Sequence, residues 1–134
     1  MIDFEVEIFD ELARLVLAQY PDAYVSSEYA PVPGAFPAVF ILESSNVENV
    51  STISSADTEQ YADVTYTVQV AHPTKQQGKR VVKALMSDID NRMRLCNLGR
   101  TMCMPVDNAD DPSIYRMIAR FTGVVKVNGM TYRR

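Results

Sequence analysis

Residues 61–71 alternate polar and apolar side chains, and this pattern predicts a half-buried β-strand. The apolar members are Val64, Tyr66, Val68 and Val70. Because successive side chains of a strand point to opposite faces of a sheet, these four share one face and the polar residues between them share the other. One face of this strand is therefore expected to be buried and the other to face water.

A long amphipathic helix is expected directly after this strand. His72 and Pro73 end the strand, since proline has no N–H to give to a ladder and restricts the residue before it. Thr74 and Gln77 have the spacing of a capping box, in which two side chains satisfy free amides of the first helical turn. Gly99 can end the helix in a left-handed conformation. The apolar positions at helical spacing are Val82, Leu85, Met86, Ile89, Met93 and Cys96.

The same patterns predict the other elements. Asp3 is a candidate cap for a first helix, which Tyr20 and Pro21 end. The run over residues 38–43 is apolar without alternation, so we expect a strand that is covered on both faces and lies at the sheet centre. The remaining predicted elements are a helix over 4–19, strands over 23–29, 38–43 and 100–106, and a hairpin of 114–127 with 130–133 around Asn128-Gly129.

The order helix, strands, helix, strands indicates an α+β fold: a mainly antiparallel (mixed) sheet with two helices packed on one face. A length of 134 residues suits one domain, residues 1–134. Residues 44–60 are rich in Ser, Asn, Thr and acidic residues. A loop of this length in a compact domain is often functional. These residues form either a long polar loop or a hairpin arm whose tip leaves the sheet.

Composition narrows the classes of function only slightly. The formal net charge of −4 gives no global reason to bind nucleic acid, although a local basic strip can still do so. The first residues are acidic, so no secretory signal is predicted, and no apolar run is long enough to cross a bilayer. Two cysteines in such a chain are interpreted as reduced thiols. We therefore expect a protein of the cytoplasm.

No catalytic constellation is recognisable, so we expect neither an enzyme nor a bound cofactor or metal. The candidate residues are His72, Cys96, Cys103, Asp107, Asp110 and Asp111. A single histidine excludes a metal site with several histidine ligands. The cysteines are too far apart for a zinc knuckle, and the acidic cluster lacks the glycine and terminal glutamate of an EF-hand loop. We interpret the cluster as a solvated turn and the cysteines as buried thiols.

The last long strand carries the most informative surface. Ile114, Arg116, Ile118 and Arg120 share one face, which is too apolar for plain solvent and too charged for a core. Such a mixture is typical of a contact surface. For the basic residues of the last hairpin the simpler alternative is a charged edge that discourages strand addition; they are Arg116, Arg120, Lys126, Arg133 and Arg134. The full candidate interface comprises Ile114, Arg116, Ile118, Arg120, Thr65, Thr67, Gln69, Glu48, Asp57, Glu59, Arg133 and Arg134.

The order of these features has a counterpart in a known family. They are an acidic amphipathic helix, a proline-rich turn into a buried strand, the Tyr-Thr-Val-Gln-Val-Ala run of residues 66–71, a helix over 78–93, Leu98-Gly99, and strands over 114–124 and 129–133. In this order they resemble the tail terminator, or tail-completion, proteins of tailed bacteriophages and prophages. The resemblance covers nearly the whole chain. It lies in the order of the elements and in their polar and apolar composition, not in a catalytic signature.

The resemblance implies a non-enzymatic assembly protein. Members of this family form a hexameric ring that caps the tail tube, stops its polymerisation and presents a docking surface for the head. The implied partners are further copies of the same chain, the tail tube protein and a head–tail connector protein; DNA passes through without specific binding, and no membrane is involved. The implied location is the host bacterial cytoplasm during assembly and then the virion, at the tail–head junction.

A ring needs heterologous contacts, in which one surface of a subunit meets a different surface of the next. We assign the face of Arg116 and Arg120 to one side of such a contact. The acidic arm with Glu48, Asp57 and Glu59 is either its complement or a surface that faces the tube or the lumen.

Three other hypotheses remain at this point. The first is another neck component, such as a head-closure or minor capsid protein. The second is a small metal-dependent hydrolase or nuclease that uses the acidic cluster and His72, and the third is an adaptor that binds one protein as a monomer.

Overall fold

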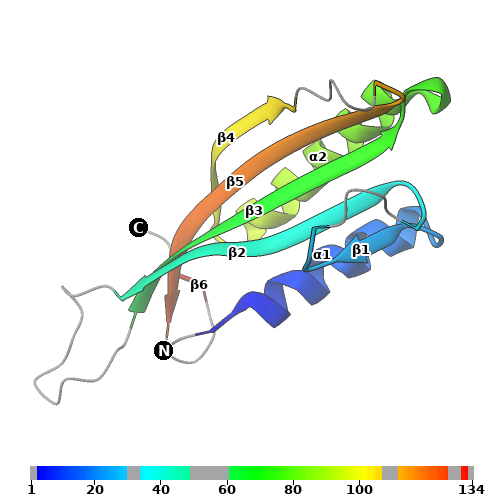
Figure 1. The fold of residues 1–134 in the computed structure, drawn as a ribbon. Coiled ribbons are helices and arrows are strands. Elements are labelled where there is room, and N and C mark those ends of the chain that lie inside the picture. Colours follow the sequence, from blue (N-terminus) through cyan, green and yellow to red (C-terminus); the bar gives the residue numbers. More distant parts are fainter. Residues whose placement is uncertain (1–2, 30–33, 49–60, 107–111, 127–130, 133–134) are drawn as a thin grey trace, which may run out of the picture.

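The alternating run lies in β3 (Tyr61–Pro73), the central strand of the sheet. We describe the fold from a computed structural model of the chain (Figure 1), in which residues 3–29, 34–48, 61–106, 112–126 and 131–132 are described. The other elements are α1 (Glu5–Gln19), β1 (Tyr24–Ser26), β2 (Ala38–Glu48), the 3-10 turn η2 (Thr74–Gln76), α2 (Gly78–Leu95), β4 (Gly99–Pro105), β5 (Ile114–Lys126) and β6 (Thr131–Tyr132).

The sheet is mixed and mainly antiparallel. Its strand order is β1-β2-β3-β5-β4, and β6 pairs with the end of β5. Only β1 and β2 run parallel among the paired strands of the described chain. Both helices lie on the same side of the sheet (Figure 1). The predicted α+β class is therefore confirmed.

The core lies between this side of the sheet and the two helices. One continuous cluster holds the buried stripe of each helix and the alternating side chains of β3, as the sequence pattern predicts. Its members on the helices are Ile8, Leu12, Val16, Val82, Leu85, Met86, Ile89 and Met93, and those on β3 include Val64, Tyr66, Val68 and Val70. No helix in the described part of the chain is both long and apolar enough to cross a membrane.

The apolar run over 38–43 was expected at the sheet centre, and this prediction is wrong. It forms the first half of β2, which lies between the short β1 and β3, whereas β3 is the strand with long partners on both edges. Ala38, Val39, Phe40 and Ile41 are buried nonetheless. Both faces are covered at this end of β2, which explains why its sequence does not alternate.

The first residues of the predicted polar arm or loop over 44–60 continue strand β2. Ser45 to Glu48 continue β2 and pair with Thr65 to Ala62 of β3, beyond an irregularity in register between Glu43 and Ser45. Residues 49–60 lie outside the described residues. The described part of the range therefore agrees with the hairpin-arm alternative rather than with a loop that starts at Ser44.

The capping box predicted at Thr74 and Gln77 is not formed. The Thr74 hydroxyl donates to the carbonyl of Pro112 at 3.1 Å, and Gln77 adopts a left-handed conformation with φ 59°. Helix α2 starts at Gly78, and no side chain caps its first turn. The chain reverses too sharply after β3 for a capping box to form.

Gly78 permits this reversal because its backbone lies against the end of β3. A Cβ atom at residue 78 would lie 2.7 Å from the carbonyl oxygens of both His72 and Pro73, whereas a Cβ at Gly99 would meet nothing within 4 Å. A methyl group so close to backbone oxygen forces the chain to move.

We expect Gly78→Ala to lower the free energy of unfolding by roughly 1–3 kcal/mol, the usual cost of overpacking. Gly99→Ala is the matched control and should change it by much less. Denaturant unfolding followed by circular dichroism measures both. Equal stability of the two variants would show that the turn relaxes without strain.

Candidate functional site

The face of the sheet opposite α1 and α2, here called the helix-free face, carries the predicted interface residues of β3 and β5. Register across the strands places Gln69 of β3 beside Ile118 of β5, which pairs with Met104 of β4. In the next row Thr67 lies beside Arg120. The structure therefore brings together side chains of β3 and β5 that lie about 50 positions apart in the sequence.

We call Thr67, Gln69, Met104, Ile118 and Arg120 the open part of this face. Arg120 is exposed and Met104 is 50% exposed, while the other three are half-buried. No ion pair involves Arg120 in the described part of the chain. A thioether, an aliphatic side chain and a free guanidinium on one flat surface form the mixture of apolar and cationic groups that contact surfaces use.

The other end of the helix-free face is covered, which corrects the prediction for Arg116. This side chain is only 4% exposed, and the ring of Tyr29 stands over its guanidinium at 5.7 Å from the ring centre. The same ring packs against Phe40 at 5.3 Å between centroids. Tyr29 belongs to the connection between β1 and β2, so a segment remote in sequence covers the arginine. Arg116 is therefore part of the folded interior and not of the open surface.

Hydroxyl groups near the middle of the face bond to one another. Thr67 Oγ1 donates to Ser44 Oγ at 2.9 Å, and Thr65 Oγ1 lies 3.2 Å from Thr122 Oγ1. Thr65 and Thr67 were predicted as interface residues, and these bonds already use part of their hydrogen-bonding capacity. Ser44 and Met104 belong to this face but were not predicted, because the irregularity in β2 and the pairing of β4 are not visible in the sequence.

Glu48, the described member of the predicted acidic complement, is not on this face. Glu48 is exposed, and its partner in register is Ala62, whose side chain lies in the core on the helix side. Within one subunit Glu48 is thus directed away from Arg120. The other charged candidates, Asp57, Glu59, Arg133 and Arg134, lie outside the described residues. Ile114 is half-buried against the covered end.

Metal or nucleophilic chemistry finds little support in the described chain. No group of three or more His, Cys, Asp or Glu side chains there is arranged to hold a metal ion. Asp107, Asp110 and Asp111 lie outside the described residues. Cys96 and Cys103 are both half-buried free thiols, and burial raises the pKa of Cys96, which disfavours the reactive thiolate.

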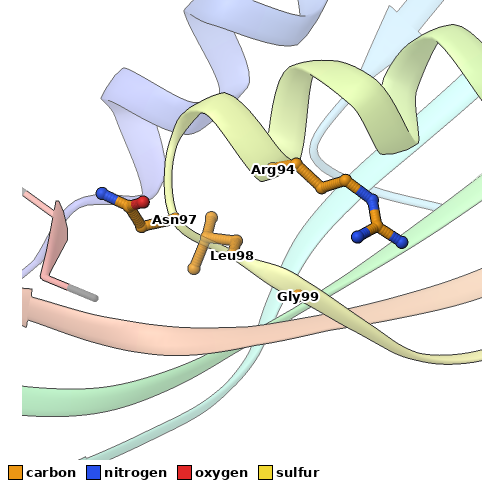
Figure 2. Close-up of a pocket in the computed structure, with 4 residues that line it drawn as sticks. All are labelled: Arg94, Asn97, Leu98 and Gly99. Carbon is orange, nitrogen blue, oxygen red and sulfur yellow. The ribbon is translucent and has the colours of Figure 1, made fainter. Parts of the chain in front are cut away.

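A small pocket of about 210 Å³ lies where α2 passes into β4 and is lined by Arg94, Asn97, Leu98 and Gly99. Figure 2 shows the side chains of Arg94 and Asn97 pointing away from each other. Arg94 Nε already donates to Asp90 Oδ2 at 3.1 Å. Binding pockets usually have polar groups that converge on a ligand, and these two do not converge.

We compared the chain with known proteins. Neither the models of known protein families nor the curated protein sequences gave a match.

His72 lies at the covered end of the sheet and is 8% exposed. Its ring meets Phe36 edge to face, with centroids 6.4 Å apart. Burial lowers the pKa of His72 below its ordinary value of 6.5, because the charged imidazolium loses its water. The folded state therefore favours the neutral ring more than the unfolded chain does.

This shift predicts a specific dependence of stability on pH. Below about pH 6.5 the unfolded chain takes up a proton at His72 more readily than the folded chain does, so the free energy of unfolding should fall as the pH drops from 6.5 toward 5. Above pH 7 both states are neutral and the effect should vanish.

His72→Phe keeps an aromatic ring beside Phe36 and removes the titrating group. Chemical denaturation of both proteins between pH 5 and 8 should show a shallower pH dependence for the variant. Parallel curves for the variant and the parent protein would mean that His72 does not cause the loss of stability.

Proposed function

We propose that this chain is a non-enzymatic phage or prophage assembly protein that forms a ring on the end of the tail tube. The ring stops polymerisation of the tube and provides the surface on which the head docks. Its proposed partners are further copies of the same chain, the tail tube protein and a head–tail connector protein. It acts first in the bacterial cytoplasm and then at the tail–head junction of the virion, where DNA passes through it without specific binding.

The single observation that carries this proposal is the open part of the helix-free face. A sheet face that keeps Met104 half exposed and Arg120 exposed without an ion pair in the described residues is suited to contact with another protein. We assign this surface to the tail tube. The order of elements that resembles tail terminators supports the same function.

The covered end limits the area available for this contact. Because Tyr29 and Phe40 pack over Arg116, the contact surface consists of Arg120 and its neighbours in register rather than the whole of β5. The guanidinium of Arg120 provides charge and direction, while Ile118 and Met104 provide apolar area.

The proposal is tested with purified tail tube protein from the same phage or prophage. Tube polymerisation is followed by electron microscopy with and without this protein, and the mass of the protein alone is measured by sedimentation. We expect a ring in solution and tubes that stop growing when the ring is present. Tubes of unchanged length together with a monomeric mass would overturn the proposal.

Within that experiment we expect the double variant Arg120→Glu, Ile118→Ser to lose the capping of tubes while its ring mass and thermal stability stay close to those of the parent protein. The reason is that both side chains lie on the open part, away from the core. Arg14→Glu is the matched control, since Arg14 is an exposed arginine of α1 on the other side of the sheet. If the double variant caps tubes normally, the open part is not the tube contact.

A further inference from the structure

Charged side chains of opposite sign, most of them exposed, collect at opposite ends of β3. The acidic end comprises Asp3, Glu5, Glu7, Glu43 and Glu48, where α1 begins and β2 ends. The basic end comprises Lys75, Lys79, Arg80 and Lys83, where β3 turns into α2. Figure 1 shows these places at the lower left and the upper right of the sheet.

The strand β3 separates the two ends. Glu48 is opposite Ala62 near the start of β3, and Lys75 follows Pro73 at its end. At about 3.3 Å per residue, β3 spans roughly 36 Å from Ala62 to Pro73 and roughly 23 Å from Tyr66, the partner of Glu43, to Pro73. Charges so far apart are screened from each other at physiological salt, so neither end neutralises the other within one subunit.

The acidic end holds several carboxylates together without a cation in the described residues. Glu5 Oε2 accepts a hydrogen bond from the amide of Glu43 at 2.7 Å, and Asp3 Oδ1 accepts one from the amide of Glu5 at 3.1 Å. These bonds fix Glu5 beside Glu43. The pKa of Glu43 is raised mainly by burial; a hydrogen bond that Asn46 Nδ2 donates to Glu43 Oε1 at 3.0 Å opposes this rise, and the negative charges of Asp3 and Glu5 add to it. Like charges held this close destabilise an isolated subunit.

A buried hydroxyl beside the acidic end has no hydrogen-bond partner among the described residues. Tyr66, which carries it, is 0% exposed and pairs in register with Glu43. Burial and the nearby charges of Glu43 and Glu5 raise the pKa of this phenol. An unsatisfied buried hydroxyl costs free energy, so this corner of the isolated subunit is incompletely satisfied.

The basic end is unfavourable in an isolated subunit for a related reason. The first turn of α2 contains no acidic residue, and Lys79 and Arg80 lie at the positive end of the helix dipole. Arg80 Nη1 donates to Gln77 Oε1 at 2.9 Å, but none of the four cations forms an ion pair with an acidic side chain in the described chain.

We propose that the acidic end of one copy of this chain binds the basic end of the next copy. This inference rests on the proposed function and names the contact that builds the ring, which leaves the helix-free face for the tail tube. The two surfaces differ and lie at opposite ends, so the contact is heterologous, as a closed ring requires. Each contact brings a cation to the carboxylates of Glu5 and Glu43 and an anion to the start of α2, relieving both sites.

Charge reversal tests the contact directly. The acid-reversed variant is Glu7→Lys, Glu48→Lys and the base-reversed variant is Lys79→Glu, Lys83→Glu; all four side chains are exposed and make no described hydrogen bond. Either variant alone places two like charges at every contact, while Asp3, Glu5 and Glu43 or Lys75 and Arg80 keep their charge, and should shift the sedimenting mass from the ring toward the 15.0 kDa monomer. An equimolar mixture should recover the ring, because the ends of the two variants are complementary.

The controls are Ser87→Lys and Ser87→Glu, which change charge at an exposed position of α2 away from both ends and should leave the ring mass unchanged. The ring of the parent protein should also dissociate as salt rises toward about 1 M, where the Debye length is about 3 Å. Circular dichroism confirms that each variant is folded.

The outcomes separate this inference from the proposed function. A parent protein that is monomeric at low salt and does not cap tubes overturns the proposed function itself. A ring that keeps its mass in both reversed variants and at high salt overturns the inference alone. Loss of duplex DNA binding in the base-reversed variant, with an intact ring, would assign the basic end to nucleic acid and also overturn the inference.

Discussion

The fold depends on the hydrogen bonds that β3 makes along both of its edges. The strands β2 and β5 pair directly with β3, and the helices α1 and α2 pack against its buried face. Its partners β2 and β5 are in register with it along most of its length. The alternation of its side chains then directs one face toward α1 and α2. The polar side chains of β3 lie on the opposite face. The strand register places residues of β5, and next to them residues of β4, beside these polar positions. The position of each proposed contact surface follows from this arrangement.

The sequence predicts those features that depend on local periodicity. The stripe of α2 and the alternation of β3 each require a single buried face, and both are found in one core cluster. The order and class of the elements follow from the same patterns. The pairing of β5 with β6 also follows, although the Asn128-Gly129 turn that suggested it lies outside the described residues.

Features that depend on contacts between distant segments are not predictable in this way. Arg116 shares a face with Arg120 by periodicity, yet the connection between β1 and β2 places Tyr29 over one arginine and leaves the other exposed. Thr74 and Gln77 match a capping box, but the carbonyl of Pro112 takes the Thr74 hydroxyl. In both cases a contact with a segment distant in sequence decides the structure, although the local sequence pattern by itself favours another arrangement.

The surfaces described above differ in whether their side chains find partners within the same subunit. At the covered end of the helix-free face, the guanidinium of Arg116 packs against the ring of Tyr29, and this ring packs against Phe40. In the described residues, no aromatic ring packs over the charged groups of the open part or of the two charged ends in this way. A protein with separate unsatisfied surfaces in different directions can bind several neighbours at once, which is the geometry an assembly protein needs.

The bond from the amide of Glu43 to the carboxylate of Glu5 has one more consequence. Beyond β1, this amide lies on the side of β2 that no described strand covers, where a foreign strand would otherwise pair. The carboxylate occupies the position that the carbonyl of such a strand would take. The carboxylate of Glu5 thus protects this edge of the sheet from pairing with the strand of another molecule.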